Sequence, residues 1–187
     1  MSVAASSYSV APTIESRRAW EDLQAWLPAM LDELLASEVY GRANRPPREQ
    51  RGVYLFSDGE GRHQYVGRTG ITARSRLAGS TPSTSFRARF DQHTQDGRPP
   101  WSAPFAMRLA REEAALEDLD VPTAWWRHRT DHPQLHGLFT AAKRRIADEM
   151  QMRIVAFDDD IKGIRSTVAE TYVHALLRTT YNDFSPS

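Results

Sequence analysis

The apolar residues near the N-terminus recur at intervals of three and four positions. This spacing places them on one face of an α-helix, so it predicts an amphipathic helix over residues 15–36. Thr13 or Ser16 can cap its start. Residues 1–13 are small and polar, which is typical of a loosely ordered arm. The apolar positions of the helix are Trp20, Leu23, Leu27, Met30, Leu31 and Leu34.

The pattern changes to that of β-strands after the segment 41–47, which is rich in helix-breaking residues. Gly52–Phe56 is a run of β-branched and aromatic residues. Residues 57–62 are polar and contain two glycines, and His63–Gly67 then resumes the strand pattern. A strand, a glycine-bearing turn and a second strand together predict a β-hairpin.

Two tyrosines lie on this predicted hairpin. Antiparallel pairing of the strands would bring Tyr54 and Tyr65 near each other. Gly67, at the end of the second strand, would let a backbone or a ligand approach closely. Both tyrosines could also serve only as packing residues on a small sheet.

The rest of the chain predicts mostly helices. The region around 97–150 is a helical elaboration, and the last helix carries its apolar residues at Val168, Tyr172, Val173, Leu176 and Leu177. Helices are expected at 86–95, 105–119, 135–149 and from Ile164 or Ser166 to Thr179, with a third strand at 152–157.

Length and composition indicate one α/β domain. A chain of 187 residues can bury a substantial core, and we divide it into an N-terminal arm and helix (1–50) and a main domain (51–187). The chain has no cysteine, which excludes disulfides, thiolate metal sites and a cysteine nucleophile. It shows no apolar run long enough for a membrane span and no secretory signal, so the expected location is the cytoplasm.

The charge is zero overall but uneven along the chain. Residues 62–111 contain nine arginines against two aspartates, a net charge of +7. Arginine suits bidentate contacts with phosphate oxygens, so this stretch predicts a nucleic-acid-facing surface. A solvated helix face is the alternative. The arginines nearest the hairpin, and thus the expected nucleic-acid contacts, are Arg68, Arg74, Arg76 and Arg87.

Further polar residues stand at regular spacings on the predicted helices. Arg89 and His93 are four positions apart, hence on one helix face. Glu170 and His174 form a similar pair on the last helix. Asn182 follows Glu170 by twelve positions.

Taken in order, these motifs resemble the GIY-YIG nuclease superfamily. The match consists of Gly52–Tyr54, Tyr65–Gly67, Arg89 with His93, Glu170, and Tyr181–Asn182, and it spans roughly residues 51–187. The resemblance implies a small three-stranded antiparallel sheet flanked by helices. It also implies hydrolysis of DNA phosphodiester bonds with the help of a divalent metal ion.

The resemblance further implies a role for each matched residue. Glu170 would hold one Mg²⁺ or Mn²⁺ ion, Tyr54 would be the general base, and His93 would accept its proton. Tyr65 and Asn182 would position the reactants, although these two are the residues best explained by architecture alone.

The resemblance assigns the stabilising positive charge to an arginine, and two arginines compete for that role. Compact family members carry the arginine about ten residues after the second tripeptide, near Arg74 or Arg76. We favour Arg89 because only Arg89 has a histidine four residues later, and we keep Arg76 as the substitute.

The chain is most similar to a restriction-type or standalone endonuclease. DNA is the expected partner, and a homodimer that cuts both strands is one option. The alternative is a catalytically silent module that keeps the fold and binds nucleic acid or a protein.

Overall fold

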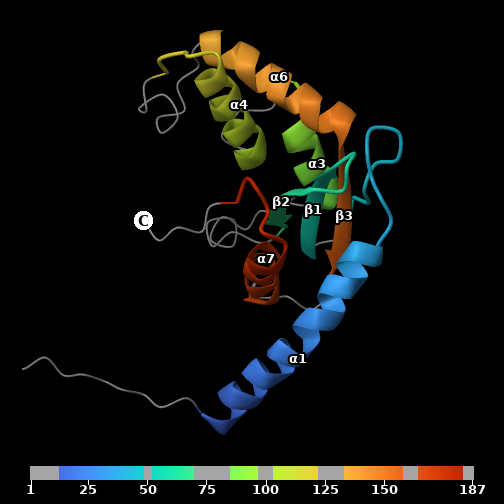
Figure 1. Cartoon of the computed structure of the whole chain (residues 1–187). Coiled ribbons are helices and arrows are strands. Elements are labelled where there is room, and N and C mark those ends of the chain that lie inside the picture. The colour runs from blue at the N-terminus through green and yellow to red at the C-terminus, as the bar shows by residue number, and fades with distance from the viewer. Residues whose placement is uncertain are drawn as a thin grey trace, which may run out of the picture.

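The computed structural model of the chain describes residues 13–48, 52–69, 85–96, 103–121, 133–157 and 164–182. These residues form a three-stranded antiparallel sheet with helices on both faces (Figure 1). The predicted α/β class and the antiparallel hairpin are therefore confirmed. The strands lie in the order β2-β1-β3 and are β1 (Gly52–Asp58), β2 (His63–Arg68) and β3 (Met150–Ala156).

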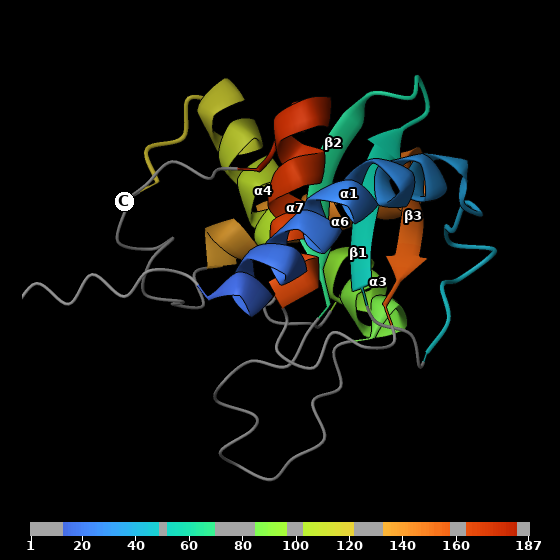
Figure 2. The same cartoon turned by 90° about the horizontal axis from the view of Figure 1, so that it is seen from below.

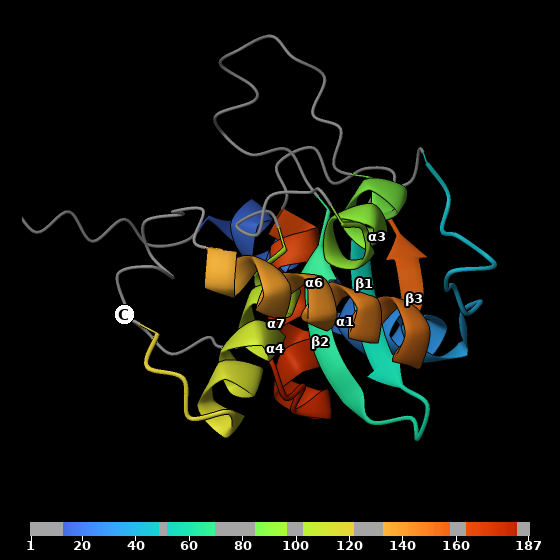
Figure 3. The same cartoon turned by 90° about the horizontal axis from the view of Figure 1, so that it is seen from above.

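Five helices in the described part of the chain cover the sheet. Helices α3, α4 and α6 lie on one side of it (Figure 3), and α1 and α7 on the other (Figure 2). None of these helices has the combination of length and apolar character that crossing a membrane requires. Their bounds are α1 (Ile14–Ala36), α3 (Phe86–Thr94), α4 (Pro104–Leu116), α6 (Pro133–Glu149) and α7 (Ile164–Leu177).

Helix starts follow local capping chemistry. The Thr13 hydroxyl accepts a hydrogen bond from the Ser16 amide at 3.1 Å, which makes Thr13 the N-cap of α1. Ser85 caps α3 in the same way through the amide of Ala88, at 3.3 Å. Both helices therefore begin within a residue or two of their predicted positions.

Successive side chains of β1 point to opposite faces of the sheet, where they enter two separate cores. Tyr54 and Phe56 belong to the core beneath α3, α4 and α6, whereas Val53 and Leu55 belong to the core beneath α1 and α7. Helices α4 and α6 come from the predicted helical elaboration, and α1 comes from the N-terminal segment. All three contribute buried residues to these cores, so they form an integral part of the fold.

The predicted apolar face of α7 is confirmed except at Leu176. Val173 is buried, and Val168, Tyr172 and Leu177 are partly buried against the core beneath α1 and α7, whereas Leu176 is 54% exposed. The buried residues of α7 also include Ser166 and Ala169, two small residues that the apolar pattern did not select.

Candidate active site

Tyr54 on β1 extends its ring across Gly67 on the neighbouring strand. The two residues are directly paired in the sheet. A Cβ atom added to Gly67 would lie 2.4 Å from both Cζ and Oη of Tyr54. The predicted close approach at Gly67 is therefore made by the Tyr54 phenol, which reaches over the edge strand because Gly67 has no side chain.

His93 on α3 is the hydrogen-bond partner of this phenol. Tyr54 Oη and His93 Nε2 are 3.3 Å apart, and both side chains are buried. Burial, helped by the positive charges of Arg89 and Lys143, lowers the pKa of His93 from 6.5 to about 3. The imidazole is consequently neutral at physiological pH and can accept a proton.

Both tyrosines are protonated in this state. Burial raises the pKa of Tyr54 well above its usual value, and it raises the pKa of Tyr65 to about 12. The Glu170 carboxylate raises both pKa values further, while the Arg89 guanidinium lowers them. These electrostatic couplings place the two phenols, the carboxylate and the guanidinium in one cluster.

Tyr65 is held by a residue that the motif analysis missed. Its ring stacks on that of Phe105 from α4, with centroids 5.0 Å apart and planes 5° from parallel. Phe105 is fully buried and also packs against His93. The sequence placed Phe105 only at the start of the helix expected at 105–119, and only the tertiary fold brings it to the hairpin.

Arg89 lies on α3 one turn before His93, as its sequence position predicts. Its Nη1 donates a hydrogen bond to Gln92 Oε1 at 2.9 Å. Its Nε is buried and has no hydrogen-bond partner in the described part of the chain. An unpaired buried donor on a cation is costly unless an anion supplies the missing acceptor.

Glu170 reaches the cluster from α7 and is paired with an arginine. Arg68 Nε on β2 donates to Glu170 Oε2 at 2.9 Å. Burial raises the pKa of Glu170, and the charges of Arg68 and Arg89 oppose this. Arg68, which the sequence predicted as a nucleic-acid contact, therefore binds the predicted metal ligand in this structure.

The residues present suit a divalent ion held by one carboxylate. No group of three histidine or acidic side chains within the described ranges could hold a metal ion by itself. Mg²⁺, however, retains several waters and commonly binds through one carboxylate together with phosphate oxygens. Glu170 supplies that single hard oxygen donor, since only its Oε2 contacts Arg68.

Asn182 covers the edge of the sheet. Its side-chain amide donates to the Val66 carbonyl oxygen and accepts from the Val66 amide, both at 2.7 Å. Val66 lies between Tyr65 and Gly67, so Asn182 holds the strand that carries both. Asn182 thus stabilises the strand that carries Tyr65 and Gly67, and its expected part in positioning the reactants stays a prediction.

A short hydrogen-bond chain supports Asn182. The Thr179 hydroxyl donates to Asn182 Oδ1 at 2.8 Å and lies 2.7 Å from His174 Nδ1. A hydroxyl has one proton, so His174 Nδ1 must be the donor in the second contact. This chain links α7 to the edge of β2 beside the tyrosine cluster.

The described arginines of the basic stretch bind protein groups. Arg87 Nε donates to the Pro46 carbonyl oxygen at 2.7 Å, Arg62 binds Asp58, and Arg108 binds the Tyr181 carbonyl oxygen. The predicted nucleic-acid contacts Arg74 and Arg76 lie outside the described residues. Contact of this stretch with phosphate accordingly stays a prediction.

Comparisons with known proteins found no matching family model and no significant similarity to a curated protein or a solved structure. The function must therefore be inferred from the tyrosine cluster itself.

Proposed function

We propose that this protein is a divalent-metal-dependent DNA endonuclease that works in the manner of the GIY-YIG nucleases. The convergence of five predicted residues supports this proposal. They come from β1, β2, α3 and α7, which are distant in the sequence, and they are Tyr54, Tyr65, Arg89, His93 and Glu170.

The Tyr54–His93 pair supplies the proton path. Tyr54 Oη takes a proton from the attacking water as it passes its own proton to His93 Nε2. His93 is neutral and has a lone pair for this proton, but its lowered pKa makes it a weak acceptor, so the transfer also depends on the activation of Tyr54. Tyr54 begins with a raised pKa, so its activation requires added positive charge near Oη.

Arg89 and Glu170 supply the electrostatic part. Bound at Glu170, a divalent ion would act as a Lewis acid on the scissile phosphate. Arg89 faces the same region with an unpaired Nε donor, which can bind a phosphate oxygen as negative charge builds. Arg68 keeps the Glu170 carboxylate ionised in the meantime.

One observation favours the alternative, a catalytically silent nucleic-acid-binding module. Arg68 already neutralises Glu170, and an ion entering the site has to compete with that guanidinium. If the Arg68–Glu170 pair never separates, Glu170 cannot bind a metal ion, and the protein keeps the fold without catalytic activity.

Plasmid cleavage distinguishes the two functions. We expect the purified chain to nick or linearise supercoiled DNA in Mg²⁺ or Mn²⁺, and EDTA to abolish this. Glu170→Ala should remove the activity without unfolding the protein. The matched control is Glu60→Ala, which removes a carboxylate that pairs with Arg62 on the exposed hairpin turn.

Each result has a clear meaning. Full cleavage by Glu170→Ala would refute the proposed metal ligand. DNA binding by the wild-type protein without any cleavage, in either metal, would favour the silent module.

A further inference from the structure

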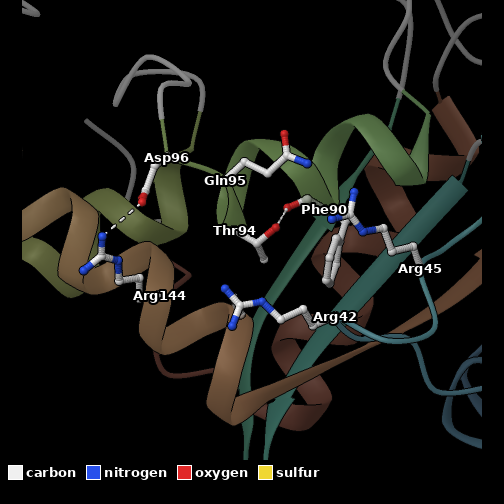
Figure 4. A pocket seen from close by; sticks show the side chains of 8 residues that line it. Arg42, Arg45, Phe90, Thr94, Gln95, Asp96 and Arg144 are labelled. Atoms are coloured by element: carbon white, nitrogen blue, oxygen red, sulfur yellow. Dashed lines mark hydrogen bonds and ion pairs between the residues drawn. The ribbon is translucent and has the colours of Figure 1, made fainter.

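A polar cavity of about 320 Å³ lies beside α3. Its walls are the segment following α1, the C-terminal end of α3, and α6 (Figure 4). Phe90 and Thr94 line it from α3, whereas Arg89 and His93 occupy the adjoining face of the same helix. None of the residues assigned to the catalytic cluster lines this cavity.

Three arginines from two separate segments line this cavity. They are Arg42 and Arg45 from the segment after α1, and Arg144 from α6. Among the described residues of the lining, Asp96 supplies the carboxylate. Asp148 and Asp91, which pair with Arg42 and Arg45, are not part of the lining, so guanidinium groups predominate at the cavity surface. This surface favours an anionic ligand.

Each of these arginines is oriented by one acidic partner. The N–O distances are 2.5 Å for Arg42 with Asp148, 3.5 Å for Arg45 with Asp91, and 3.4 Å for Arg144 with Asp96. A guanidinium has five N–H donors, so a single ion-pair contact leaves most of them available. The pairs of Arg42 and Arg144 are exposed, and exposed ion pairs are weak and rearrange easily.

The wall that carries Arg42 and Arg45 is fixed by backbone contacts. Arg87 on α3 donates to the carbonyl oxygens of Pro46 and Arg45, at 2.7 and 3.3 Å. The Gly41 amide closes a turn by donating to the Asn44 carbonyl oxygen at 2.8 Å. The cavity is thus formed before any ligand binds.

The size of the cavity exceeds that of a bare anion. At about 30 Å³ for each water, it corresponds to roughly ten water molecules. Phe90 and Ala147 add apolar surface to its lining. Convergent guanidinium groups beside an apolar wall suit a phosphate that carries an organic group.

We propose that this cavity, formed by Arg42, Arg45 and Arg144, binds a phosphate ester. The ester can belong to the backbone of a DNA strand or to a free nucleotide, which share this chemistry. Only the DNA source rests on the proposed nuclease function. In that case the cavity holds the strand beside α3, the helix that also carries Arg89 and His93 of the catalytic cluster.

A nuclear magnetic resonance titration of the full chain tests the binding directly. With 2′-deoxyadenosine 5′-monophosphate as the probe, we expect shifts at the amides of the cavity lining. Deoxyadenosine, which lacks the phosphate, should produce none. Arg42→Gln/Arg144→Gln should weaken nucleotide binding at least tenfold, and Arg62→Gln/Arg145→Gln, which removes equal charge elsewhere, should not.

DNA binding in EDTA identifies the source of the phosphate. The logarithm of the binding constant falls with the logarithm of salt concentration by about 0.9 for each phosphate contact. If a DNA strand occupies the cavity, the salt dependence of DNA binding in Arg42→Gln/Arg144→Gln should correspond to about one to two fewer phosphate contacts than in the wild-type protein. The change in Arg62→Gln/Arg145→Gln should be smaller. Equal slopes in the two double variants, with nucleotide binding lost only in the first, would assign the cavity to a free nucleotide.

The proposal is overturned by two results. One is nucleotide binding that persists unchanged in Arg42→Gln/Arg144→Gln. The other is a wild-type protein in which the nucleotide shifts no amide resonance of the cavity lining, while DNA binding by the two double variants depends equally on salt. Localised nucleotide binding by a protein that cuts no plasmid would instead refute the nuclease and leave the cavity assignment intact.

Discussion

Replacing Gly67 with alanine would place a methyl group where the Tyr54 phenol now lies. The new Cβ would be 2.4 Å from Tyr54 Cζ and Oη, and ordinary contact begins at 3.4 Å. The phenol would therefore have to move by about 1 Å, which would disturb its 3.3 Å contact with His93 Nε2. The backbone conformation itself accepts alanine, because Gly67 does not have a positive φ.

The expected cost divides between stability and rate. Overpacking of this kind typically costs about 1–3 kcal/mol of the free energy of unfolding. A displacement of about 1 Å at a catalytic group costs about 100-fold in rate. Gly67→Ala should therefore remain folded at the assay temperature but nick plasmid about 100-fold more slowly under single-turnover conditions.

Two comparisons make the result specific. Gly137→Ala on α6 adds the same methyl group where no atom lies within 4 Å, so it should leave cleavage unchanged. In a Tyr54→Phe background, Gly67→Ala still displaces the ring but should lower the residual rate no further, because the phenolic oxygen is already absent. A Gly67→Ala protein that is destabilised but cleaves at the wild-type rate would show that the position of the Tyr54 phenol does not matter for the reaction.

Three further predictions concern the same cluster. Arg89→Ala should slow cleavage by about 100- to 1,000-fold, as loss of a charge-stabilising donor does. Arg76→Ala should leave cleavage intact and only reduce the salt dependence of DNA binding by about one phosphate contact. The reverse pattern would transfer the catalytic role to Arg76. Tyr54→Phe should cost about 1–3 kcal/mol of the free energy of unfolding, since it leaves the buried His93 Nε2 without its hydrogen-bond partner. Plasmid cleavage by this variant should nevertheless collapse, and an active variant would refute the role of Tyr54 as general base. The pKa of His93 is lowered to about 3 in the folded state, so the unfolded state binds more protons between that value and 6.5. The free energy of unfolding should therefore fall as the pH decreases through this window, by up to about 1.4 kcal/mol per pH unit more than in His93→Gln. Chemical denaturation at several pH values measures this difference. Parallel pH profiles for the two proteins would show that His93 is not buried as a neutral base.

The spacing of residues along the chain determined the local structure. The helix of residues 14–36 and the hairpin follow from apolar periodicity and from turn residues, which act within a few positions of each other. The spacing also placed Arg89 and His93 on one helical turn. These features need no knowledge of the fold.

Only the tertiary structure decided how the elements meet. Phe105 stacks on Tyr65 because α4 folds over the hairpin, and nothing in the sequence near Phe105 indicates this contact. The pairing of Arg68 with Glu170 joins residues 102 positions apart. The sequence predicted that Arg68 contacts nucleic acid, whereas in the folded chain Arg68 pairs with the carboxylate of Glu170.

The same distinction explains α7 and the arginine-lined cavity. Periodicity selected most of the α7 residues that pack on the core, but it did not select the small buried residues Ser166 and Ala169. Arg42 and Arg144 share a cavity although they are far apart in the sequence. Local propensity acts over one turn or one hairpin, whereas these contacts depend on how whole elements pack, and such packing leaves no periodic signal in the sequence.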